Sequence, residues 1–231
     1  MSLPRILLVT GTDTEVGKTV VTAALAVCLA RLGSVAVYKP TQTGVKGSEP
    51  GDADEVARLS GLTSVHEGVR LEDPLAPTTA ARRVGIRLPG IGDHAARVHE
   101  LARTHDTVLV EGAGGLLVGL DTEGHGLAEL AGRLDLDVAF VVVVRAGLGT
   151  LNHSRLTVEA LASRGLPCLG LAVGAWPAEP GLAEQCNLAD LPVVTSTPLV
   201  GQVPAGAAAM SPRAFTAAAP DWFVPPLGRR T

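Results

Sequence analysis

The feature that most constrains this chain is a short glycine-containing loop near its start, GTDTEVGKT at positions 11–19. The loop follows the apolar run 5–10, and over 17–32 apolar residues recur at the spacing of a helix that Gly33 ends. A loop that joins a strand to a helix in this way directs backbone N–H groups at the helix start toward a phosphate group. We therefore interpret the segment as a phosphate-binding loop.

Individual residues of this loop have separate chemical tasks. Gly17 removes a Cβ where the backbone meets phosphate, Lys18 reaches the outer phosphates, and Thr19 offers a hydroxyl to Mg²⁺. The usual pattern GxxxxGK[ST] has glycine at position 12, where this chain has Thr12, but the strand–loop–helix context supports the interpretation. The loop residues expected to bind a nucleotide are Thr14, Glu15, Val16, Gly17, Lys18, Thr19 and Val20.

Strand-like and helix-like segments alternate beyond the loop. Short apolar runs predict strands at 35–38, 107–110, 138–144 and 168–173. Helical spacing predicts helices at about 52–59, 94–104, 127–134 and 151–164. This alternation predicts right-handed crossovers and an α/β fold of the P-loop NTPase type, doubly wound, with a mainly parallel sheet and helices on both faces.

Two parts of the chain give weaker signals. The segment 62–89 has few periodic features and three prolines, so we expect a surface excursion there. The tail after Trp176 is rich in Pro, Gly and Ala, and its periodicity is poor. Because no internal repeat or linker is visible, we expect a single domain over 1–231.

Composition gives no sign of nucleic-acid or membrane binding. The net charge is −4 and the pI is near 5.9, so there is no broad attraction to nucleic acid or anionic lipid. The longest strongly apolar run, 138–144, is far shorter than the roughly 20 residues that span a bilayer. No secretory signal precedes the loop, so we expect a cytoplasmic protein. The three cysteines lack CxxC spacing, which argues against a disulfide framework and a zinc site.

Carboxylates that could hold Mg²⁺ follow two of the predicted elements. Glu111 stands at the carboxyl end of the strand 107–110, the edge where ligands bind in open α/β sheets. A second carboxylate is expected from GDADE, either Asp52 or Asp54, and we prefer Asp52. Purely local roles remain open: Glu111 could cap a turn, and an aspartate at a helix start is common as an N-cap.

The ordered motifs GTDTEVGKT, YKPTQTG, VEGAGG and GLGTLNHSRLTVEAL closely resemble those of dethiobiotin synthase. The resemblance covers residue 5 to about 175, and APTTAAR and PLVGQVP, at 76–82 and 198–204, resemble the family less sharply. It implies a homodimer with its substrate site at the subunit interface. It also implies an enzyme that uses ATP and Mg²⁺ to join CO₂ to 7,8-diaminopelargonic acid, giving dethiobiotin, ADP and phosphate in biotin synthesis.

The same resemblance implies roles for residues of these motifs. Lys18 would hold the phosphates, and Lys39 of YKP would stabilise the carbamate formed from CO₂ and the phosphoryl group in transfer, although a solvated lysine at a strand end is the alternative. The magnesium ligands would be Thr19, Asp52 and Glu111. Groups binding the diamine substrate or its carbamate would come from Thr14, Lys39, Thr43, Gly114 and, in the partner subunit, Gly149, Thr150, Leu151 and Asn152.

One position departs from the family pattern. Members usually contact adenine with an asparagine just after the strand that ends here in LAVGAW, where this chain has Gly174 and Ala175. A base without this amide partner is less well discriminated, so we expect other nucleoside triphosphates to compete with ATP. The base would then be held by the backbone at Gly174 and in the tail, at Pro198, Val200, Pro204, Ala205 and Gly206.

Two other functions are alternatives to this one. A ParA-like or MinD-like ATPase switch would bind protein, DNA or membrane, but related switches carry a second lysine early in the loop, where this chain has Asp13. The acidic net charge and the lack of a basic amphipathic tail also count against a switch. An ATP-dependent amide ligase acting on a corrin precursor would need a glutamine-hydrolysing domain, for which this chain has no room.

Overall fold

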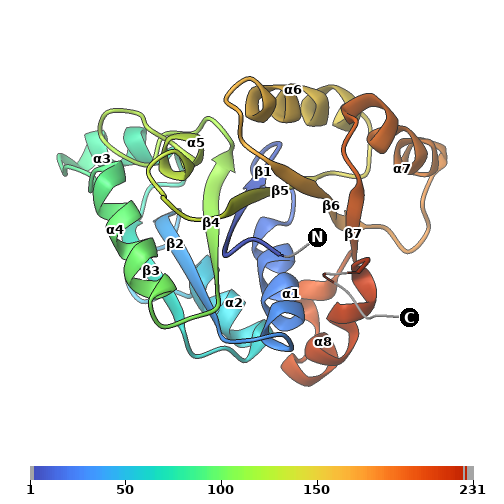
Figure 1. The fold of residues 1–231 in the computed structure, drawn as a ribbon, viewed down its shortest axis with the longest axis horizontal. Coiled ribbons are helices and arrows are strands. Elements are labelled where there is room, and N and C mark those ends of the chain that lie inside the picture. Colours follow the sequence, from blue (N-terminus) through green and yellow to red (C-terminus); the bar gives the residue numbers. More distant parts are fainter. Residues whose placement is uncertain (1–2, 226, 228–231) are drawn as a thin grey trace.

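A single parallel sheet organises the computed structural model, which describes residues 3–225 and 227. The strand order is β3-β2-β4-β1-β5-β6-β7, and every neighbouring pair is parallel (Figure 1). The strands are β1 (Ile6–Gly11), β2 (Val35–Thr43), β3 (Val65–Leu71), β4 (Thr107–Gly115), β5 (Val138–Val144), β6 (Cys168–Trp176) and β7 (Leu199–Pro204). The predicted doubly wound α/β fold is confirmed.

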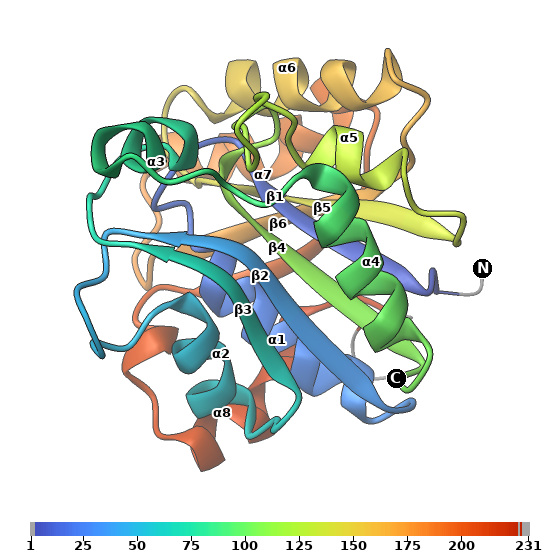
Figure 2. The ribbon, with the colours of Figure 1, turned by 90° about the vertical axis from the view of Figure 1, so that its left-hand side faces the viewer.

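Helices cover both faces of this sheet (Figures 1 and 2). One face carries α1 (Lys18–Ala30), α2 (Asp52–Ser60) and α8 (Pro212–Ala218). The other carries α4 (Ile91–Ala102), α5 (Leu127–Ala131), α6 (Thr150–Ala162) and α7 (Leu182–Thr195). The short helix α3 (Pro77–Val84) packs against Leu71 at the end of β3.

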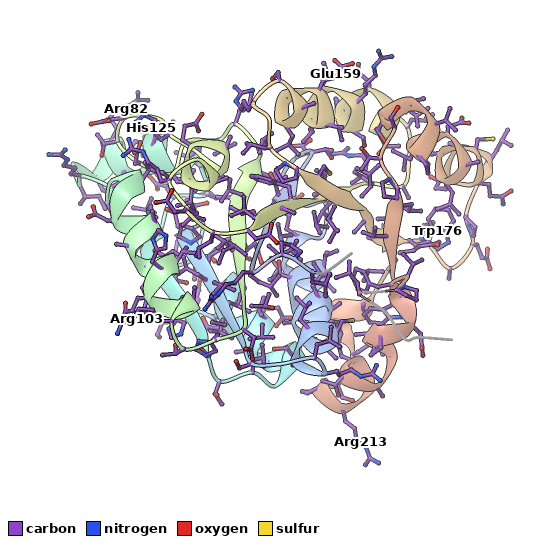
Figure 3. The ribbon with its side chains drawn as sticks, viewed as in Figure 1. Arg82, Arg103, His125, Glu159, Trp176 and Arg213 are labelled. Atoms are coloured by element: carbon purple, nitrogen blue, oxygen red, sulfur yellow. The ribbon has the colours of Figure 1, made fainter. Side chains whose placement is uncertain are left out.

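The central strands are apolar on both sides because both sides are covered. In β1, Leu7 and Val9 pack into the layer of α1, while Ile6 and Leu8 pack into the layer of α4 and α5. Such continuous apolar runs are typical of buried parallel strands. Figure 3 shows side chains filling both layers, whereas the charged groups of Arg103, Glu159 and Arg213 point outward.

The segment 62–89 is not the surface excursion that the sequence predicted. It contains β3, which pairs with β2 along its length, and α3. The strand signal is weak because β3, VHEGVRL, lies at the edge of the sheet and most of its residues are only partly buried. The helix signal is weak because α3 is short, although Pro77 in its first turn favours a helix start.

The tail after Trp176 is also more regular than its composition indicated. It contains α7, β7 and α8, and α7 continues past Pro192 to Thr195. A proline inside a helix removes one N–H donor and usually marks an end, which obscured this helix in the sequence. Asn187 ties α7 to the loop between β5 and α6, since its side-chain amide donates to the carbonyl oxygens of Ala146 and Gly147.

The carboxyl ends of the central strands meet at one edge of the sheet. The loop after β1 lies there, next to the distal parts of β2 and β4, which run on through Thr43 and Gly115 beyond their predicted ends. Open parallel sheets bind ligands at this edge. Among residues 3–225 and 227, no helix is both long and apolar enough to cross a membrane.

Candidate active site

The loop between β1 and α1 is shaped to receive an anion. Gly17 adopts φ of 93° immediately before α1, and no side chain caps the helix start. The first N–H groups of α1 are therefore available for phosphate oxygens. Lys18 folds back over the loop, and its Nζ donates to the carbonyl oxygen of Asp13 at 2.9 Å. Burial, together with the nearby charge of Lys39, lowers the pKa of Lys18 below its ordinary value.

This loop packs directly on the end of β6. A Cβ at position 17 would lie 2.6 Å from the carbonyl oxygen of Gly174, and a Cβ at position 174 would overlap the carbonyl oxygen of Val16. Only glycine fits at either position without moving the backbone. Of the two positions that stand where the family pattern has an asparagine, 174 and 175, position 174 has room only for glycine, because an asparagine side chain there would collide with the phosphate-binding loop.

A buried group of charges lies beside the loop. The Nζ of Lys39, in β2, is 2.5 Å from Oδ2 of Asp52 and 2.8 Å from Oε1 of Glu111, and it donates to the carbonyl oxygen of Gly112. The Lys39 and Glu111 side chains are 4% and 1% exposed. Thr19 donates its hydroxyl to the same Glu111 oxygen at 2.9 Å. The group thus joins the first turns of α1 and α2 to β2 and β4.

Lys39 remains charged in this buried position. Burial acts to lower the pKa of Lys39, but the carboxylates of Glu111 and Asp52 outweigh it, so its pKa lies above the ordinary value. The same partnership keeps Asp52 ionised: burial raises its pKa, while Lys39 and a hydrogen bond with Thr19 bring it below the ordinary value. The Lys39 ammonium and the carboxylates of Asp52 and Glu111 together carry a net negative charge next to the anion-binding loop.

These side chains could hold a magnesium ion. Thr19, Asp52 and Glu111 present a hydroxyl and two carboxylates, the hard oxygen ligands that Mg²⁺ takes together with phosphate oxygens and water. Asp54 points away from this group: its carboxylate accepts a hydrogen bond from the Gly51 N–H and pairs with Arg70, and the Asp54 side chain is 56% exposed. Of the two aspartates considered from the sequence, Asp52 alone lies in the buried group.

A cavity of about 900 Å³ opens over these groups. The predicted site residues that line it are Thr14, Glu15, Gly17, Lys18, Thr19, Val20, Lys39, Thr43, Asp52 and Gly114. Two further parts of the lining were not predicted from the sequence: Gln42, whose side-chain oxygen accepts the Asp52 N–H at 2.8 Å, and the wall formed by 74–77. That wall lies between β3 and α3, in the segment interpreted as a surface excursion. The glutamine gave no signal beyond its place in YKPTQTG.

The helix start at 149–152 does not line this cavity. Gly149, with φ of 87°, precedes Thr150, the first residue of α6, and no side chain caps this helix either. Thr150 is buried, Asn152 is exposed, and Leu148 just before them is 83% exposed. Within this chain these residues therefore stand apart from the groups around Lys18 and Lys39.

The tail residues predicted to bind the nucleotide fall into two groups. Pro204 ends β7 at the carboxyl edge, and there Ala205 donates its N–H to the Trp176 carbonyl oxygen while Gly206 takes φ of 83°. Pro198 lies instead just before the amino end of β7, at the opposite end of the strands from the phosphate-binding loop. Val200 is buried against Gly170 in the core. These positions do not support nucleotide contacts for Pro198 or Val200. The sequence motif predicted such contacts because it does not show in which direction its strand runs.

Relatives match nearly the whole chain. A family model described as an AAA domain matches residues 5–213. The ATP-dependent dethiobiotin synthetase BioD of Rhodococcus jostii (strain RHA1) is 57% identical over 219 residues, covering 94% of each chain. The protein of the same name from Streptomyces coelicolor is 57% identical over 223 residues, covering 96% of this chain and 93% of the relative. The chain belongs to the dethiobiotin synthetase family.

Solved structures share the fold of this dethiobiotin synthetase family member at low identity. MinD complexed with Mg-ADP from Pyrococcus horikoshii OT3 has a TM-score of 0.56 at 16% identity, covering 93% of this chain and 86% of that chain. A ParA family ATPase from Chlorobium tepidum TLS has a TM-score of 0.53 at 12% identity, covering 92% and 90%. The likeness supports the α/β fold alone, and carries no argument for a switch function.

The close contact between Gly174 and the phosphate-binding loop predicts that a side chain at position 174 weakens nucleotide binding in this dethiobiotin synthetase family member. Gly174→Ala places a methyl group against the Val16 carbonyl, so the loop must move away from β6. We expect nucleotide affinity to fall at least about tenfold, measured by titration calorimetry. Gly92→Ala is the matched control, because nothing lies within 4 Å of a Cβ at that position in α4. Equal affinity in wild type and Gly174→Ala would contradict this packing argument.

Proposed function

We propose that this chain synthesises dethiobiotin, using ATP and Mg²⁺ to join CO₂ to 7,8-diaminopelargonic acid and releasing ADP and phosphate. The observation that carries the proposal is the Lys39 ammonium, buried and charged between Asp52 and Glu111 beside the phosphate-binding loop. Identity of 57% to dethiobiotin synthetases over almost the whole chain supports it. Biotin synthesis in the cytoplasm follows as part of the same proposal.

The chemistry consists of three bond-forming steps. One substrate amine adds to CO₂ and loses a proton, giving a carbamate. A carbamate oxygen attacks the γ-phosphorus of ATP and the bond to ADP breaks, giving a mixed anhydride. The second amine then attacks the carbamate carbon and phosphate leaves, which closes the ureido ring. Each step creates or transfers an anionic group, so positioning and charge neutralisation are the main contributions required of the protein.

The residues around the cavity suit these demands. Lys18 would neutralise the outer phosphates, and Lys39 would lie between the carbamate and the phosphoryl group in transfer. Thr14, Thr43 and the backbone at Gly114 line the same cavity and would bind the carbamate or the amines. Thr19, Asp52 and Glu111 would hold Mg²⁺, which when bound neutralises phosphate oxygens as charge develops.

The proposal includes a homodimer that completes the substrate site. In this arrangement the helix start at 149–152 reaches the partner's cavity, where its free N–H groups would bind the carboxylate at the far end of the diamine. Exposed apolar side chains on this helix and just before it suit burial in an interface: Leu148 is 83% exposed and Leu156 57%. The acidic net charge of −4 gives no electrostatic attraction to nucleic acid or to an anionic membrane surface.

The proposed function is tested by phosphate release from ATP and Mg²⁺. We expect diaminopelargonate with bicarbonate to stimulate release, and DNA or lipid vesicles to have no effect. Lys39→Ala should lower the stimulated rate at least about a hundredfold, because the developing charge loses its buried cation. Lys46→Ala, in the loop after β2, is the control. Stimulation by DNA or lipid alone would favour a ParA-like or MinD-like switch, and a fully active Lys39→Ala variant that is folded by circular dichroism would remove Lys39 from the mechanism.

A second prediction concerns the nucleotide base. A side chain at position 174 would collide with the phosphate-binding loop, and Ala175 has no polar side-chain atom. Neither position therefore offers the side-chain amide donor and acceptor with which an asparagine would recognise adenine. The backbone at 204–206 would hold the base without strong discrimination. We expect CTP, GTP and UTP to support the diamine-dependent release of phosphate at rates within about tenfold of the ATP rate at equal concentration. A strict requirement for ATP in this panel would contradict the prediction.

A further inference from the structure

The first half of the phosphate-binding loop is fastened to β5 by two contacts. Thr12 donates its N–H to the carbonyl oxygen of Val143 at 3.0 Å. Arg145, the residue after β5, donates from Nη2 to Oδ2 of Asp13 at 2.8 Å. The backbone contact is a continuation of the β1–β5 pairing, whereas the ion pair depends on these two side chains.

Asp13 connects this ion pair to the groups that meet phosphate. Its other carboxylate oxygen accepts the N–H of Thr14 at 2.8 Å, and its main-chain carbonyl accepts the Lys18 ammonium at 2.9 Å. The orientation of the Asp13 carboxylate and carbonyl therefore sets both the path of the loop and the place where Lys18 rests. Arg145 contacts one oxygen of that carboxylate from the position directly after β5.

We propose that Arg145 is a positioning residue for nucleotide binding, which acts through Asp13 on the loop and on Lys18. This inference rests on the proposed function, because it assumes that the loop binds a nucleoside triphosphate. Arg145 and Asp13 side chains are 43% and 48% exposed, so the pair adds little to the stability of the fold. Its contribution lies in holding the loop in one shape before the nucleotide arrives.

A purely electrostatic role makes a different prediction. If only the charges mattered, removing Arg145 would weaken the binding of a polyphosphate and removing Asp13 would strengthen it. If Arg145 acts by positioning, either removal frees the same loop and both weaken binding. The double variant should then be no worse than the single variants, since they break one shared interaction.

The experiment measures Kd for ATP with Mg²⁺ by titration calorimetry, and kcat and KM in the phosphate-release assay. We expect Arg145→Ala and Asp13→Ala each to raise Kd about threefold to fivefold, and the double variant to match them. The kcat at saturating ATP should stay within about twofold of wild type. Arg145→Lys, which keeps a cation within reach of Asp13, should recover part of the affinity. Arg97→Ala, which removes an ion pair with Glu100 on α4, is the control.

Each outcome bears on a different claim. Tighter nucleotide binding by Asp13→Ala, or additive losses in the double variant, would overturn the positioning role of Arg145. Unchanged Kd in Arg145→Ala would overturn it as well. If the wild-type protein itself bound no nucleotide, the proposed function would fail and this inference would fail with it, whereas the outcomes above overturn the inference alone. Matching thermal midpoints across the variants would show that a change in Kd does not arise from partial unfolding.

Discussion

The rest of this structure depends on a cluster of three charged side chains, Lys39, Asp52 and Glu111, in which Lys39 and Glu111 are buried and Asp52 is 35% exposed. Transferring an ammonium or a carboxylate out of water costs several kcal/mol, and the mutual attraction of the charges offsets this only in good geometry. Distances of 2.5 and 2.8 Å from Lys39 to its partners meet that requirement. Because apolar residues would stabilise such a position at least as well, the cluster is better explained by function than by stability.

The parallel sheet accounts for how these residues meet. Lys39 comes from β2, Glu111 from β4 and Thr19 from the helix that follows β1, so their separation in the sequence is large. The order β2-β4-β1 places these strands side by side with their carboxyl ends at one edge. Helix α2 then starts at the same edge and delivers Asp52. A phosphate-binding loop and a set of oxygen ligands thus follow from the topology of one sheet.

Much of this arrangement could be predicted from the sequence, because its signals are local. The strand 138–144 and the loop 11–19 have patterns that burial or phosphate binding imposes on neighbouring residues. The wall at 74–77 was missed because β3 is an edge strand with few apolar residues, so the segment looked irregular. A motif does not reveal which end of its strand faces the site, so the sequence predicts nucleotide contacts for Pro198 and Val200 that their placement does not support. Whether Asp52 or Asp54 meets Lys39 depends on the rotation of α2, which only packing determines.

The cluster of Lys39, Asp52 and Glu111 beside the loop is explained by binding of a polyphosphate together with a divalent cation. Titration calorimetry of ATP onto the wild-type protein and Asp52→Asn, each with Mg²⁺ and with a chelator, tests it most directly. The account predicts that Mg²⁺ strengthens ATP binding to the wild-type protein and has a much smaller effect on Asp52→Asn. Absence of ATP binding to the wild-type protein, or an equal effect of Mg²⁺ on both proteins, would contradict it.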